Sequence, residues 1–106
     1  MPKYLFQGSY TADGAKGLLK DGGTKRRAMA QQLIQGLGGK LEAFYFTFGK
    51  TDFVGIVDLP DNASVAAASL NISASGALSF KTTVLLTPEE MDQATKKTVA
   101  YTPPGR

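Results

Sequence analysis

The sequence predicts an α+β domain, because segments with strand periodicity and segments with helix periodicity alternate along its 106 residues. The first strand-like segment, residues 4–10, places alternate residues on one face: Tyr4, Phe6, Gly8 and Tyr10. Residues 41–48 and 53–57 are rich in strand-forming residues and flank a short turn, which indicates a hairpin. With a last strand over 78–86, the order strand-helix-strand occurs twice. This order predicts a ferredoxin-like βαββαβ antiparallel sheet with an extra C-terminal helix.

Three segments are predicted to be helices, the first two of them from the spacing of their apolar residues. Residues 11–20 begin at a cap-like Thr11 and place four residues on one face: Ala12, Ala15, Leu18 and Leu19. A second helix is predicted with Thr24 as its N-cap and runs to about Gly36, with these residues inward: Ala28, Met29, Leu33, Ile34 and Leu37. The third, residues 63–74, follows a cap at Pro60-Asp61-Asn62 and consists mainly of small residues, which let a helix lie close to a sheet.

The C-terminal part of the chain begins with the clearest local signal in the sequence. Thr87 is placed to be an N-cap, Pro88 fits the first helical position, and Glu90 completes a capping box. The predicted helix runs to about Thr98, and residues 99–106 form an extended C-terminal tail. No linker divides the chain, so residues 1–106 are expected to be a single domain.

The strand over residues 41–48 is apolar on both faces, because Tyr45 lies between Phe44 and Phe46. A sheet with one face in water would alternate apolar and polar residues instead. The two helices of a βαββαβ fold cover one face of the sheet, so the other face needs another cover. A second copy of the chain can supply it, which predicts a homodimer or higher homo-oligomer.

Composition excludes several kinds of chemistry. The chain has no cysteine and no histidine, so it lacks thiol chemistry, the commonest general base and the commonest transition-metal ligands. We expect no metal site and no cofactor. The net charge of +3 is mild and its cations are scattered, so a nucleic-acid partner is not expected. No apolar run approaches a signal region or a membrane span, so a cytoplasmic protein without a membrane partner is expected.

Several short motifs together resemble the GYD-domain family of small, largely uncharacterised bacterial proteins. The motifs cover nearly the whole chain: Gly22-Gly23-Thr24 with Arg26-Arg27, Leu37-Gly38-Gly39-Lys40-Leu41-Glu42, the turn ending at Asp52, Leu59-Pro60-Asp61, Ala74-Ser75-Gly76, and Leu85 to Met91. The resemblance implies a fold of the dimeric α+β barrel type, in which two ferredoxin-like sheets face each other. Thr51 stands where the family signature has tyrosine, so no role of that phenol is carried over.

A candidate anion site lies at the start of the second helix. Cations there are unfavourable, because a helix N-terminus carries partial positive charge. An anion would reverse this cost by accepting from backbone N–H groups and guanidinium groups at four residues: Gly23, Thr24, Arg26 and Arg27. The alternative is that these cations reach water or pair with Asp21 or Asp13. A small anionic ligand is therefore one candidate partner.

A second candidate site is the space between two facing sheets, with Tyr4, Tyr45 and Asp52 as its residues. Asp52 could act there as a base or a ligand acceptor. An aspartate after a turn more often bonds backbone N–H groups, and aromatic residues on strands more often belong to a core or an interface. The catalytic residues stay unknown from the sequence.

Three functions fit these observations. The first is an oligomeric bacterial domain that binds a small molecule or an anion and has a regulatory role without redox chemistry. The second is a cofactor-independent enzyme that uses Asp52 or a tyrosine in the inter-sheet space. The third is a structural assembly protein. The lack of histidine and cysteine weighs against the second function, and the sequence leaves catalysis open.

Overall fold

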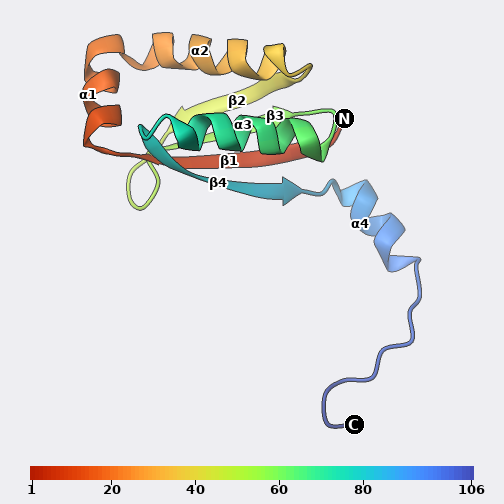
Figure 1. Ribbon diagram of the computed structural model, residues 1–106. Coiled ribbons are helices and arrows are strands. Elements are labelled where there is room, and N and C mark those ends of the chain that lie inside the picture. Colours follow the sequence, from red (N-terminus) through yellow and green to blue (C-terminus); the bar gives the residue numbers. More distant parts are fainter.

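The four strands form one antiparallel sheet in the order β2-β3-β1-β4 in the computed structural model, which describes residues 1–106 (Figure 1). The strands are β1 (Lys3–Tyr10), β2 (Lys40–Phe46), β3 (Phe53–Asp58) and β4 (Leu78–Leu85). The helices are α1 (Ala12–Asp21), α2 (Gly23–Gly36), α3 (Asn62–Ala74) and α4 (Pro88–Thr95). The α+β class and all the predicted elements are therefore confirmed. No helix is both long and apolar enough to cross a lipid bilayer.

The sheet has two unlike faces, as the alternation in β1 predicts. Tyr4, Phe6 and Gly8 are buried, whereas the residues between them are half-buried. The strand register places the covered face of β1 beside Phe53, Gly55 and Val57 of β3. We call the opposite side the open face; it carries Lys3, Leu5, Gln7, Ser9, Ala43, Tyr45, Val54, Ile56, Asp58, Ser79, Lys81, Thr83 and Leu85.

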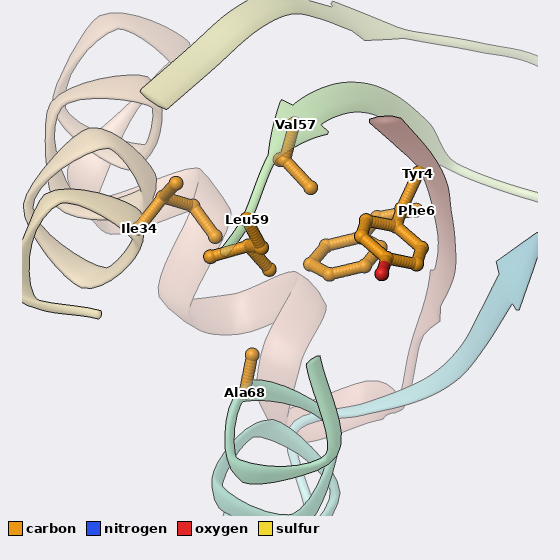
Figure 2. Packing of buried hydrophobic residues seen from close by; sticks show 6 residues of the cluster. All are labelled: Tyr4, Phe6, Ile34, Val57, Leu59 and Ala68. Atoms are coloured by element: carbon orange, nitrogen blue, oxygen red, sulfur yellow. The ribbon is translucent and has the colours of Figure 1, made fainter. Parts of the chain in front are cut away.

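The core lies between the covered face and helices α2 and α3. Six buried residues form it: Tyr4, Phe6, Ile34, Val57, Leu59 and Ala68. Figure 2 shows Ile34 of α2 and Ala68 of α3 pointing toward Leu59, which lies beside the rings of β1. Ala68 is completely buried, so the small residues of α3 do bring this helix close to the sheet.

The caps of the helices correct one prediction. Asp61 and Thr87 cap α3 and α4 with their side chains, and Thr87 and Glu90 form the predicted capping box. Thr24 does not cap α2. That helix begins at Gly23, and its N-cap Gly22 has a φ of 79°, which glycine adopts without the steric cost of a side chain.

The inward face of α1 is also different from the prediction. Gly14 is its only buried residue, while Ala12, Ala15 and Leu19 are exposed. Gly14 fits because its Cα lies against the carbonyl of Ala77, where a Cβ would lie 1.9 Å from the oxygen. In α2 the prediction holds better: Ile34 is buried and Leu33 and Leu37 are half-buried, but Ala28 and Met29 are exposed.

The first strand of the hairpin, β2, and the last strand, β4, both end earlier than predicted. β2 ends at Phe46 and includes a bulge between Leu41 and Ala43, so Phe48 lies in the following loop and is fully exposed. β4 ends at Leu85, and α4 ends at Thr95. Beyond β4, residues 86–106 extend away from the sheet, and we call them the C-terminal arm (Figure 1).

The C-terminal arm dominates the shape of the molecule. The radius of gyration is 17.0 Å, whereas a compact domain of this length has about 13 Å. Residues 88–102 are all exposed, and Val99 and Tyr101 present large apolar side chains to solvent. An isolated helix shorter than about 12 residues is marginal in water. The local capping box of α4 is therefore important to this helix.

We expect Thr87→Ala to destabilise α4 by about 1 kcal/mol, because the Glu90 N–H loses its acceptor, the Thr87 hydroxyl oxygen at 3.1 Å. Amide hydrogen exchange over residues 88–95 measures this loss. Thr98→Ala, in the exposed tail beyond the helix, is the control and should leave exchange in α4 unchanged. Equal exchange in the two variants would contradict a role for the cap.

Candidate functional site

The open face has a charged end and an apolar centre. At the charged end, Lys3 Nζ lies 2.8 Å from Asp58 Oδ1 and 2.9 Å from Glu42 Oε2. The hydrogen bonds that Lys3 donates, first to Asp58 and then to Glu42, raise its pKa above the ordinary value. Lys3 therefore stays charged at neutral pH, and its charge is met by these two carboxylates.

The centre of the open face is apolar. Leu5 of β1 pairs with Ile56 of β3, and Ile56 in turn pairs with Ala43 of β2. Tyr45 pairs with Val54 beside them and is 68% exposed. Since no helix lies on this side, these side chains form an apolar surface without cover from their own chain.

The predicted inter-sheet residues divide between the two faces. Tyr45 lies on the open face. Tyr4 belongs to the covered face: it is 3% exposed, and its hydroxyl donates to Asn62 Oδ1 at 3.1 Å. The period of two in β1 decides this, because Tyr4 shares its face with the buried Phe6. A sheet placed on the open face would therefore meet Tyr45 and not Tyr4.

Asp52 lies in the loop between β2 and β3 and bonds to the end of β1. Its Oδ2 accepts from the Tyr10 N–H at 2.8 Å, and its own N–H donates to the Gly8 carbonyl at 2.7 Å. These bonds anchor the loop to β1, and the Ser9 hydroxyl adds a third bond to the Lys50 carbonyl. Asp52 therefore bonds to backbone groups of β1, as an aspartate after a turn commonly does.

The four residues of the predicted anion site lie in the first turns of α2, but the structure separates its two guanidinium groups. Arg26 faces the space between α2 and the sheet, whereas Arg27 lies in a surface hollow with Glu42 and Tyr45.

Asp21 lies next to the start of the helix. Its carboxylate oxygens are 3.6 Å from Lys25 Nζ and 3.9 Å from Arg26 Nη1. Asp21 therefore partly compensates the charges of Lys25 and Arg26, which is the alternative to anion binding that the sequence offers. A carboxylate beside a helix N-terminus is also favourable in itself. Anion binding by Gly23, Thr24, Arg26 and Arg27 stays a prediction.

The structure contains one site that sequence reasoning missed, a cavity of about 220 Å3 between α2 and the covered face. Every strand contributes to its lining, and Ile72 of α3 adds to it. Thirteen of its fifteen lining residues are hydrophobic, and Arg26 is the only charged one. We call it the helix-sheet cavity. In the sequence, the closely spaced phenylalanines indicate an aromatic core. They do not show whether that core is filled or contains a cavity.

Two polar side chains lie at the helix-sheet cavity, Tyr10 from the end of β1 and Arg26 from the first turns of α2. Burial raises the pKa of the Tyr10 phenol above its ordinary value, although the neighbouring Arg26 guanidinium opposes the rise. The phenol is therefore protonated at neutral pH and can donate a hydrogen bond. The cavity thus combines apolar walls with one cation and one neutral donor.

Comparisons with known proteins agree with the resemblance in the sequence motifs. The family model described as the GYD domain matches residues 4–95. A protein of Thermus thermophilus, named glutamine synthetase and cystathionine beta-lyase binding protein, is 32% identical over 82 residues. The match covers 77% of this chain and 85% of that protein, whereas no solved structure matches the chain. The chain belongs to the GYD-domain family.

Proposed function

We propose that this chain is a binding and regulatory protein that works as a homo-oligomer and acts on a partner enzyme, without redox chemistry of its own. The observation that carries the proposal is the open face, whose apolar centre has no cover from its own chain. The name of the Thermus relative, which describes binding to two enzymes, supports a protein partner.

The fold within this proposal is ferredoxin-like and of the dimeric α+β barrel type. The strand order β2-β3-β1-β4, with every pairing antiparallel, supports the ferredoxin-like part. The covered face already has α2 and α3, so a second sheet has the open face left to pack on. Monomers rarely expose an apolar patch of more than a few hundred Å2, so an uncovered apolar sheet face favours a second copy as its cover.

A second copy of this chain is the occupant that fits the open face. Lys3 is already paired with Asp58 and Glu42, whereas Lys81 of the edge strand β4 is unpaired and would stay at the rim of the interface, in contact with water. An apolar centre with a charged rim is the usual anatomy of a stable protein interface. Aromatic residues such as Tyr45 are enriched in such interfaces, because their ring is apolar and their hydroxyl can stay in contact with water.

The C-terminal arm gives an independent reason for a second copy. It leaves the sheet at the end of β4, which pairs with Lys3 at the start of β1, and it then runs away from its own core (Figure 1). Val99 is 85% exposed and Tyr101 is 71% exposed. A neighbouring copy would bury these side chains and stabilise α4, which is too short to be stable alone. We propose that the arm packs on that copy.

We expect the protein to sediment as a multiple of its 11.2 kDa chain mass at micromolar concentration. Ile56→Asp should shift it toward the monomer, because it places a charge at the apolar centre of the open face, where burying that charge is costly. Analytical ultracentrifugation over a concentration series measures the shift in mass.

The matched control is Leu70→Asp, which makes the same chemical change on α3, where Leu70 is 70% exposed. Circular dichroism should be unchanged in both variants. A parent protein that sediments only at 11.2 kDa would contradict self-association. A monomeric Leu70→Asp variant beside an oligomeric Ile56→Asp variant would contradict the choice of the open face.

The partner enzyme can be tested directly. Glutamine synthetase and cystathionine beta-lyase from the organism that encodes this chain are the first candidates, by analogy with the Thermus relative. We expect the labelled chain to co-sediment with at least one of them and not with an unrelated enzyme of similar mass. Free sedimentation of the label in both mixtures would reject these partners.

A further inference from the structure

The helix-sheet cavity is large for so small a protein and is partly open to solvent, so that a ligand can enter it. Protein interiors are packed as densely as organic crystals, and voids larger than a water molecule are few. An apolar cavity of about 150 Å3 in another protein stays dry and takes up benzene. At about 220 Å3, this cavity has room for a molecule somewhat larger than benzene.

The walls of the cavity favour an aromatic occupant. Phe44 and Phe53 stack with centroids 5.4 Å apart and an angle of 19°, and Phe6 meets Phe80 edge-on at 4.7 Å and 73°. All four rings line the cavity. Aromatic rings pair best in offset-stacked or edge-to-face geometry, and the rings of these two pairs can offer both geometries to a ligand ring.

The polar groups of the cavity favour an anion. Arg26 Nη1 donates to the Met29 sulfur at 3.3 Å, which is a weak acceptor. The closest carboxylate oxygen, Asp21 Oδ2, is 3.9 Å from Nη1, which is too long for a hydrogen bond. The guanidinium therefore keeps donors for a ligand, and the protonated Tyr10 phenol beside it supplies another.

We propose that the helix-sheet cavity binds a small aromatic carboxylate, with its ring among the phenylalanines and its carboxylate at Arg26 and Tyr10. Scaling from benzene, the volume of about 220 Å3 suits about nine non-hydrogen atoms, the size of benzoate. Phenylacetate is larger by one carbon atom, which the open side of the cavity can accommodate. The site lies within one chain and does not use the open face. Its test is therefore independent of self-association and of the partner enzyme.

The experiment is calorimetric titration of the full chain with phenylacetate, with its neutral isostere phenylacetamide and with the aliphatic hexanoate. We expect one phenylacetate per chain, bound about tenfold more tightly than phenylacetamide, because a hydrogen bond to a charged group is the stronger kind.

Arg26→Gln should abolish this tenfold preference. The matched control is Arg27→Gln, because Arg27 lies outside the cavity, in a surface hollow with Glu42 and Tyr45. It should keep the preference.

Gly55→Ala tests the cavity itself. A Cβ at this position would lie 3.6 Å from Phe44 Cδ2 and 3.7 Å from Leu41 Cδ1, so it fits without a clash and takes up cavity space. We expect weaker binding of phenylacetate and an unchanged or higher melting temperature. No binding of phenylacetate by the folded parent, equal binding of hexanoate, or an equal loss in Arg26→Gln and Arg27→Gln would each overturn the proposal.

Discussion

We expect Leu59→Ala to lower the free energy of unfolding by about 2–5 kcal/mol, the range for leucine-to-alanine changes in a core. Leu59 follows β3 and is completely buried, between Ile34 of α2 and Ala68 of α3 (Figure 2). Its loss would leave a void where both helices meet the sheet. The cost consists of the lost transfer free energy and of the contacts that this void removes.

Urea denaturation at several protein concentrations measures the effect of Leu59→Ala and separates it from any change in assembly. Leu70→Ala is the matched control, since this leucine of α3 is 70% exposed and alanine is a good helix former. It should change the free energy of unfolding by no more than about 0.5 kcal/mol. Similar losses in both variants would contradict the position of the core.

The second large effect is expected at Gly14. Gly14→Ala should lower the free energy of unfolding by about 1–3 kcal/mol or more, the cost of overpacking a core. An added Cβ would lie 1.9 Å from the carbonyl oxygen of Ala77. That oxygen cannot move aside at low cost, because it accepts from the Thr11 N–H at 2.9 Å and from the Thr11 hydroxyl at 3.1 Å. Either α1 moves away from the sheet, or these bonds break.

Gly17→Ala is the control for Gly14→Ala, because it makes the same change one turn further along α1. Nothing lies within 4 Å of a Cβ there. Alanine should therefore stabilise the helix, by about 0.5–1 kcal/mol. Thermal unfolding should shift in opposite directions in the two variants. Shifts of the same sign would show that α1 does not pack on Ala77 in this way.

The elements of this fold could be predicted because their signals are local. The alternation over β1 needs only the two-residue period of a strand, and it correctly placed Tyr4 and Phe6 on one face. The capping box of Thr87 and Glu90 joins residues three apart and forms as predicted. The same holds for Asp61, whose side chain accepts from the Ser64 N–H at 2.8 Å.

The candidate sites could be predicted only in part, because their residues meet through long-range packing. Asp52 and Tyr10 are 42 positions apart, and only the pairing of β1 with β3 lets the carboxylate reach the Tyr10 N–H. The sequence predicts Tyr4 in an inter-sheet space, whereas the helices on the covered face bury it in the core. The sequence identified Arg26 as a residue of a candidate anion site or as a partner of Asp21 or Asp13, but not as part of a cavity.

Local signals in the chain specify the types of the elements, the two faces of the sheet and the side-chain caps of α3 and α4, since each depends on residues a few positions apart. Which surfaces are buried depends on long-range packing. Leu19 has the larger apolar side chain, yet Gly14 is the buried residue of α1, because the carbonyl of Ala77 leaves no room for a side chain there. The helix-sheet cavity has the same origin. It is the space that remains when α2 rests on aromatic rings from several strands, and no local pattern specifies that distance.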